Sequence, residues 1–117
     1  MSKRPYYIIY YTTEYDGYRA QIKYIGTNFK AARDRYYFLR EYIIQHYFLD
    51  EGVQEDRIEK YYADVPDNMH IGETICSSMN DGDMMYDTLS LACVDTLHFF
   101  NNNEEREYKI AYPNSKF

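Results

Sequence analysis

Aromatic and β-branched residues dominate the start of the chain and predict a β-hairpin. Residues 5–13 read PYYIIYYTT, a composition typical of a strand. Asp16-Gly17 is a turn signal, and residues 18–25 alternate well enough to form the returning strand, which Gly26 ends.

A helical repeat of apolar residues follows the hairpin. We expect one long helix over about residues 28–49, because Thr27 or Asn28 can cap its first turn and Gly52 is a natural stop after its end. At helical spacing, the expected buried stripe is Ala32, Tyr36, Leu39, Ile43 and Tyr47. The opposite side of this helix carries Lys30, Asp34, Glu41 and Gln45.

The segment after the helix has two interpretations. Residues 58–63 alternate, which predicts a short strand, and a short helix over residues 54–63 is the alternative. Residues 65–68 read VPDN, which is typical of a loop. The sequence leaves the choice between strand and helix open.

The remainder of the chain favours strands. Residues 70–79 and 84–100 flank the turn cluster at residues 80–83. Alternation around residues 88–93 favours a strand in the second of these, although Met85, Leu89, Ala92 and Thr96 also fit one face of a helix. Residues 106–112 are expected to form a final strand.

Together these elements predict a single α+β domain over residues 1–117. We expect a largely antiparallel sheet of about five to six strands in hairpins, with the long helix packed on one face. The physical reason is that a helix with one apolar stripe needs a sheet face to cover. A domain of this length buries roughly two-thirds of the surface of its unfolded chain, which is enough for a core.

Composition places the chain in a reducing compartment and away from membranes. Cys76 and Cys93 are widely spaced and form no CxxC motif, so two free, buried thiols are expected. No stretch approaches the ~20 apolar residues that span a bilayer. The apolar run behind the basic start is short and broken by polar residues, so we expect no signal peptide and a cytoplasmic location.

Charge is distributed unevenly along the chain. Residues 1–49 hold eight Lys and Arg against four acids, whereas residues 50–105 hold two bases against fourteen acids. Residues 106–117 hold three bases and one acid, and the whole chain carries a net charge of −6. This asymmetry bears on association with partners and not on the fold.

Three interpretations of this asymmetry compete. In the first, an acidic, tyrosine-flanked face binds a basic, nucleic-acid-handling protein through Glu55, Asp56, Glu59, Tyr61, Tyr62, Asp64, Asp67, Asp81, Asp83, Tyr86 and Asp87. In the second, the first half binds nucleic acid through Tyr7, Tyr11, Arg19, Lys23, Arg33 and Arg40. In the third, the two segments neutralise each other across the fold or between subunits. A pI of 5.0 favours the first over the second, since nucleic-acid-binding domains are usually basic.

Motifs for chemistry are absent from the sequence. No glycine-rich phosphate loop occurs, and His46, His70 and His98 lack partners at metal-ligand spacing. We therefore expect no cofactor, no metal and no enzymatic activity. A small-ligand protein or enzyme with a pocket between helix and sheet is the remaining alternative.

The general profile is that of a short, acidic, aromatic-rich chain without a catalytic signature. In composition it resembles the small inhibitors that bacteriophages and mobile elements encode against host defence enzymes. That resemblance implies a non-enzymatic protein that inhibits or masks its partner. A homodimer is also compatible with the sequence, because aromatic strands at a sheet edge invite pairing.

Overall fold

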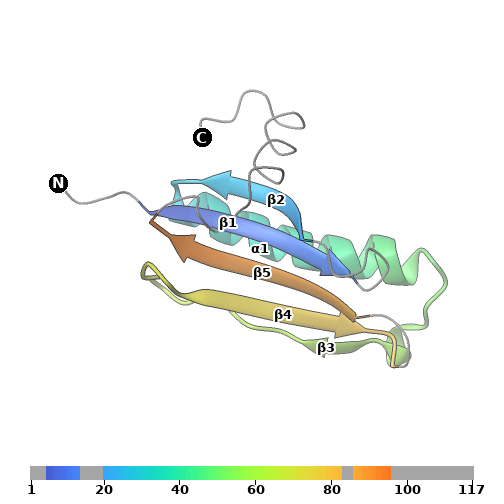
Figure 1. Cartoon of the computed structure of the whole chain (residues 1–117). Helices are drawn as coiled ribbons and strands as arrows, with labels where there is room; N and C mark the ends of the chain where they lie inside the picture. The colour runs from blue at the N-terminus through green and yellow to red at the C-terminus, as the bar shows by residue number, and fades with distance from the viewer. Residues whose placement is uncertain (1–4, 14–19, 83–85, 96–117) are drawn as a thin grey trace.

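The computed structural model describes residues 5–13, 20–82 and 86–95, and this part of the chain forms an α+β fold (Figure 1). Its sheet has five antiparallel strands in the order β2-β1-β5-β4-β3. The elements are β1 (Tyr6–Thr13), β2 (Gln21–Gly26), α1 (Phe29–Ile43), the π-helix η2 (Ile44–Leu49), the 3-10 turn η3 (Glu55–Arg57), β3 (Glu59–Tyr61), β4 (Thr74–Asn80) and β5 (Tyr86–Val94). The predicted fold class is confirmed.

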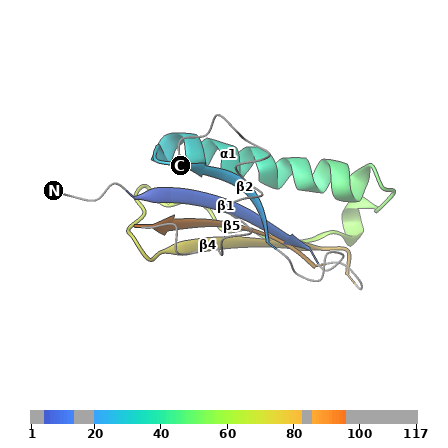
Figure 2. The ribbon, with the colours of Figure 1, turned by 45° about the horizontal axis from the view of Figure 1, so that its top comes forward.

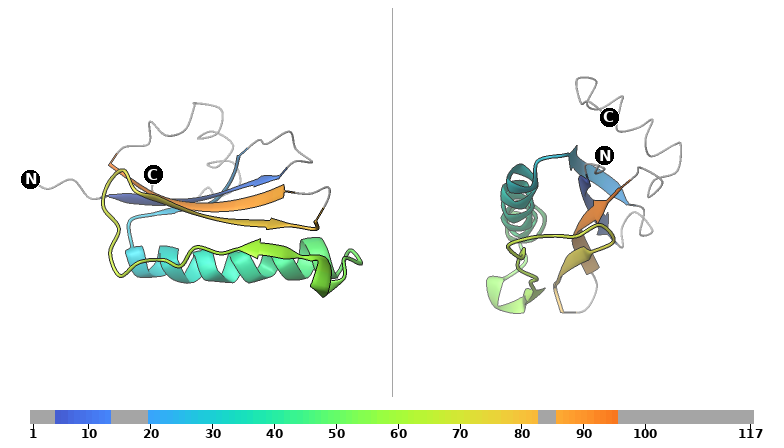
Figure 3. Two further views of the ribbon diagram at one scale, coloured as in Figure 1. Left: turned by 90° about the horizontal axis from the view of Figure 1, so that it is seen from below. Right: turned by 90° about the vertical axis from the view of Figure 1, so that its left-hand side faces the viewer.

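The molecule has two layers, a twisted sheet and one long helical segment on one of its faces. Figures 2 and 3 show α1 lying along the strands and covering one face of the sheet. The core lies between these layers, where Ile9, Leu89, Leu91 and Met79 are buried against the helix. Ile8 and Ile25 form a smaller buried cluster on the other face of the sheet.

The start of the helix follows the predicted capping chemistry. Asn28 is the N-cap, and its side-chain oxygen accepts a hydrogen bond from the backbone N–H of Ala31 at 2.9 Å. Four members of the predicted stripe are buried, namely Ala32, Tyr36, Leu39 and Ile43. The prediction was therefore correct for the first four turns.

The prediction is wrong for the fifth member of the stripe, Tyr47. Tyr47 is 36% exposed, and Phe48 is fully buried in its place. The cause is η2, in which backbone bonds connect residues five apart, as in the 2.9 Å bond from the Asp50 N–H to the Gln45 carbonyl. Ile43 and Ile44 are both buried, and the next buried position is Phe48, five residues after Ile43 and not four.

Both open alternatives of the second half are decided by the structure. Residues 54–63 contain a single 3-10 turn followed by the short strand β3, so each interpretation was partly right. Residues 86–94 form the strand β5, which pairs with β1 and β4, and the helical alternative is wrong for them. The expected strand at residues 106–112 lies outside the described residues.

The structure also tests the predictions about the two cysteines and about membrane-spanning segments. Cys93 is buried as expected, but Cys76 is exposed on β4, which corrects the prediction of two buried thiols; both are free. In the described part of the chain, no helix is long and apolar enough to cross a membrane.

Candidate protein-binding surface

The segment from residue 50 to residue 67 follows the β3 edge of the sheet along the length of the molecule (Figure 1). We call this segment the acidic edge. It carries two bases, Arg57 and Lys60, and seven exposed acids, which are Asp50, Glu51, Glu55, Asp56, Glu59, Asp64 and Asp67. Tyr61 stands among these carboxylates with 63% of its surface exposed.

Arg40 on α1 fixes the middle of the acidic edge to the helix. Its guanidinium lies over the rings of Tyr62 and Tyr37, at 4.0 and 4.9 Å from their centroids. It also donates a hydrogen bond to the carbonyl oxygen of Ala63 at 3.3 Å and lies 3.7 Å from the Asp64 carboxylate. One half-buried cation thus holds three consecutive residues of the edge in place.

Two hydrogen bonds from the backbone of the edge complete this attachment. The Val65 N–H donates to the Tyr37 hydroxyl at 2.8 Å, and the Ala63 N–H donates to the Ser77 hydroxyl at 3.0 Å. Ser77 in turn is hydrogen-bonded to the buried hydroxyl of Tyr36. The backbone of the edge is therefore held by the fold, while its carboxylates face outward.

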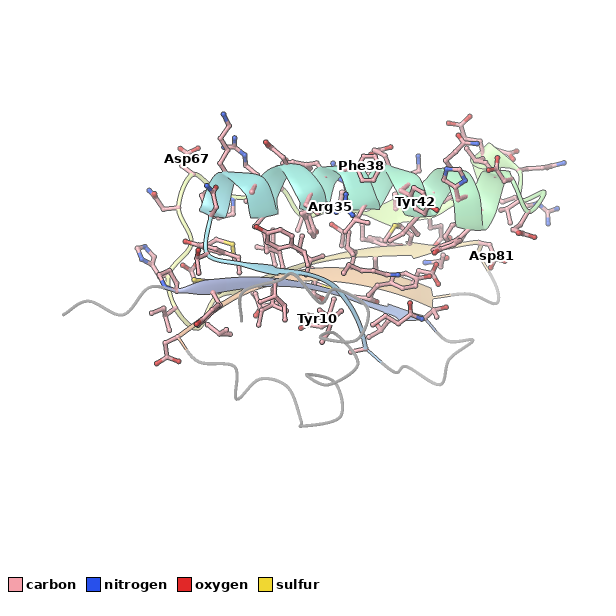
Figure 4. All side chains as sticks on the ribbon, turned by 90° about the horizontal axis from the view of Figure 1, so that it is seen from above. Tyr10, Arg35, Phe38, Tyr42, Asp67 and Asp81 are labelled. Atoms are coloured by element: carbon pink, nitrogen blue, oxygen red, sulfur yellow. The ribbon has the colours of Figure 1, made fainter. Side chains whose placement is uncertain are left out.

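Six residues of the expected partner-binding face lie in chain order along the acidic edge: Glu55, Asp56, Glu59, Tyr61, Asp64 and Asp67. They form a line and not a compact patch. Tyr62, expected as an anchor for a partner, is instead half-buried beneath Arg40. Figure 4 shows Asp81 and Asp67 at opposite ends of the molecule; Asp81 lies at the end where the edge begins and lines a hollow there with residues 52–54 and Arg57. Asp83 and the side chain of Tyr86 lie outside the described residues.

Asp87, which was expected on the partner-binding face, lies in the core instead. It is 2% exposed, and its Oδ2 accepts a 2.5 Å hydrogen bond from the Tyr11 hydroxyl inside the core. Burial raises the pKa of the Asp87 carboxyl, while hydrogen bonds from Tyr11 and Thr13 act in the opposite direction. The sequence placed Asp87 outside because its charge suggested exposure, but its strand position points toward the helix.

We expect Asp87→Asn to stabilise the fold by on the order of 1 kcal/mol at pH 7, because it removes a buried charge and keeps an acceptor for Tyr11. The raised pKa means that the folded state holds this proton more strongly than the unfolded state. Ionisation of Asp87 therefore costs stability above the folded pKa, and the cost disappears as the pH falls toward the ordinary carboxyl value. Urea unfolding at pH 7 and pH 4 measures this, and an advantage of the variant that does not shrink at pH 4 contradicts it.

No family model, curated protein or solved structure matches this chain. Any function proposed for it must therefore come from its own geometry and charge.

The residues expected to bind nucleic acid do not form a common surface. Tyr7 and Tyr11 are buried in the core, so their rings are not accessible for stacking on bases, which corrects that expectation. Arg40 is engaged with Tyr62 and Asp64, and Arg33 lies 3.6 Å from the Asp34 carboxylate. Lys23 is half-buried over the Tyr11 ring, and burial lowers its pKa. Arg19 lies outside the described residues.

An open hollow lies at one end of the molecule. It is lined by residues 52–54, Arg57 and Asp81, which belong to loops and to η3. This hollow is not the pocket between helix and sheet that the small-ligand or enzyme alternative expects, and that alternative stays a prediction.

One surface feature escaped the sequence analysis. On the side of the helical segment toward β2, four aromatic side chains are exposed together with Arg35. We call this surface the aromatic flank; its members are Arg35, Phe38, Tyr42, His46 and Tyr47. The i, i+4 spacing of Phe38 and Tyr42 outside the apolar stripe was the signal that could have revealed it.

Proposed function

We propose that this chain is a non-enzymatic binding protein that masks a basic, nucleic-acid-handling partner with its acidic edge. The observation that carries the proposal is the row of seven exposed acids against two bases along residues 50–67, the segment that contains the edge strand β3. Two of the seven have partners within the chain, since Asp50 lies 3.0 Å from His46 and Asp64 lies 3.7 Å from Arg40. Spaced carboxylates on a fixed backbone imitate the phosphates of a nucleic acid and suit a groove lined by Lys and Arg. The compositional resemblance to phage-type inhibitors of host defence enzymes supports the same class of function.

The attachment of the edge supports this role energetically. A carboxylate row on a flexible segment would lose conformational freedom on binding, and that loss weakens affinity. Here Arg40 and the Tyr37 hydroxyl already hold the backbone in the free protein. Tyr61 offers a large ring beside Glu59, and interface energy concentrates in a few such rings.

The test begins with capture of a partner from the native host on the immobilised chain, followed by mass spectrometry. The captured protein is then bound to labelled single-stranded DNA, and the chain is titrated against this complex while anisotropy is followed. We expect the chain to displace the DNA. We expect the double variant Glu55→Lys/Glu59→Lys to require about 100-fold more protein, since paired charges at an interface contribute a few kcal/mol.

The matched control is Asp34→Lys/Asp95→Lys, which makes the same change in net charge at exposed positions on α1 and after β5, away from the edge. It should compete nearly as well as the unmodified chain. Equal loss in both double variants would reduce the effect to net charge alone. A captured partner without a basic surface, or a chain that leaves the DNA bound, would refute the proposal.

A further inference from the structure

The connection between β4 and β5 begins with the dipeptide Asp81-Gly82, a sequence prone to backbone isomerisation. β4 ends at Asn80, and these two residues follow it directly. Asp81 is half-buried and Gly82 is exposed. Because glycine has no Cβ to shield its backbone nitrogen, that nitrogen is open to attack on the carboxyl group of the preceding residue. The dipeptide therefore has the composition at which an aspartate side chain reacts with its own backbone.

The reaction at such a dipeptide is an intramolecular ring closure. The Gly82 nitrogen forms a bond to the side-chain carboxyl carbon of Asp81, and the proton of the nitrogen leaves with the carboxyl OH as water. Water then opens the resulting succinimide at either carbonyl, which restores aspartate or gives isoaspartate. The water released in the first step balances the water consumed in the second, so no other reactant is needed. Because the two groups belong to adjacent residues, their effective concentration is high.

In the folded chain, the attacking nitrogen is engaged in a hydrogen bond. The Gly82 N–H donates to the side-chain oxygen Oδ1 of Asn80 at 2.9 Å, and the φ of Gly82 is 92°. An asparagine side chain that accepts from the residue two positions later forms an Asx-turn. The nitrogen must lose this proton before the ring can close, so the hydrogen bond has to break first. Asn80 therefore opposes the reaction.

Asn80 is fixed in the position that this hydrogen bond requires. It is 2% exposed, and β4 holds its backbone opposite Tyr86 of β5. Its amide nitrogen Nδ2 is buried and has no hydrogen-bond partner within the described residues. A buried donor without a partner costs stability, so this side chain is a poor filler for the end of the sheet. What it supplies is the oxygen that binds the Gly82 N–H.

Isoaspartate at this position changes the shape of one end of the molecule. A Cβ placed on Gly82 would lie 3.7 Å from the Arg57 carbonyl oxygen, so the connection rests against η3. Asp81 lies at this end of the molecule (Figure 4) and lines the hollow there with residues 52–54 and Arg57. Isoaspartate adds one carbon to the backbone and keeps one carboxylate. It therefore alters the contact with η3 without altering the net charge.

We propose that Asp81 is a modification site at which isoaspartate forms, and that the side chain of Asn80 suppresses this reaction in the folded chain. Asp81 is stable as long as Oδ1 of Asn80 holds the Gly82 N–H. Loss of this single hydrogen bond starts the modification, even where the rest of the sheet stays intact.

Incubation of the full chain at mildly acidic pH, where the carboxyl group is partly protonated, tests the proposal. Digestion, chromatography and mass spectrometry then measure isoaspartate at residue 81, and a synthetic peptide of residues 78–86 is the unfolded reference. We expect isoaspartate to form roughly tenfold more slowly in the folded chain than in the peptide, because one hydrogen bond must break first.

Two variants of the same shape isolate the role of the acceptor. Asn80→Val removes it and should bring the rate to within about threefold of the peptide rate. Asn80→Thr is the matched control, since its hydroxyl oxygen can accept from the Gly82 N–H and should keep the reaction slow. Urea unfolding of both variants shows whether they are equally stable, so that a local effect is distinguished from unfolding.

A second measurement needs no variant and so does not depend on their folding. Hydrogen exchange at the Gly82 amide of the unmodified chain should be slower than in the peptide, since this N–H is hydrogen-bonded. The proposal is overturned by a peptide that forms no isoaspartate, or by a folded chain that reacts as fast as the peptide. It is equally overturned by an unprotected Gly82 amide, or by folded Asn80→Val and Asn80→Thr variants that react at the same rate.

Discussion

Replacing Phe48 by alanine is expected to lower the free energy of unfolding by about 3–5 kcal/mol, the usual cost of truncating a fully buried aromatic ring. Phe48 is fully buried between the helical segment and the sheet. Tyr47→Ala, one residue earlier, removes a ring that is partly exposed and should cost about 1 kcal/mol. The large difference between these neighbours is a direct consequence of the π-helix.

Urea unfolding of both variants, followed by circular dichroism, provides the measurement. The pair serves as its own control, because both truncations act on the same turn and have similar helix propensity effects. In a regular α-helix, Tyr47 would hold the inward position and its truncation would be the costly one. A larger effect for Tyr47→Ala than for Phe48→Ala would therefore contradict the register of this segment.

Removing the guanidinium of Arg40 is expected to cost about 2 kcal/mol of stability, through lost stacking on Tyr62 and Tyr37 and a lost ion pair. Arg40→Ala should also release the acidic edge locally. Faster amide hydrogen exchange at Ala63 and Val65 would report this, since both N–H groups are hydrogen-bonded in the intact protein.

Arg33→Ala is the control for Arg40→Ala. Arg33 is a more exposed base on the same helix with a 3.6 Å ion pair to the adjacent Asp34, and its loss should change stability by less than ~0.5 kcal/mol. Exchange rates at Ala63 and Val65 that stay unchanged in Arg40→Ala would show that the edge is held by its hydrogen bonds alone. Under the proposed function, a released edge should bind its partner more weakly, because it must be ordered on binding.

Much of the fold could be predicted because local patterns and long-range packing agree in the first half of the chain. The strand at residues 5–13, the Asn28 cap and the stripe from Ala32 to Ile43 all follow from periodicity and capping chemistry. The failure at Tyr47 has a different origin. Nothing in the residues around Ile44 distinguishes a π-helix from an α-helix, and the choice depends on which ring fills the space above the sheet.

The candidate surface was predictable in part, because the local composition already indicates which charged segments are exposed. A segment this rich in acids stays on the surface because burying several charges is costly. Glu55, Asp56, Glu59, Asp64 and Asp67 are exposed as expected. Asp87 was misplaced because strand alternation decides which face a side chain takes, and the helix covers that face. Strand alternation also turns Tyr7 and Tyr11 toward the helix, where both are buried.

By itself, the sequence determined the strand at residues 5–13, the start of the helix, the α+β class and the separation of acids from bases along the chain, since each of these follows from local composition and spacing. Tertiary structure alone decided which charged or aromatic residues face outward. Packing the helix across the sheet placed Asp87 inside, stacked Arg40 between two tyrosines and left Phe38 and Tyr42 exposed beside β2. The physical reason is that exposure depends on contacts between residues distant in the chain, which no local pattern records.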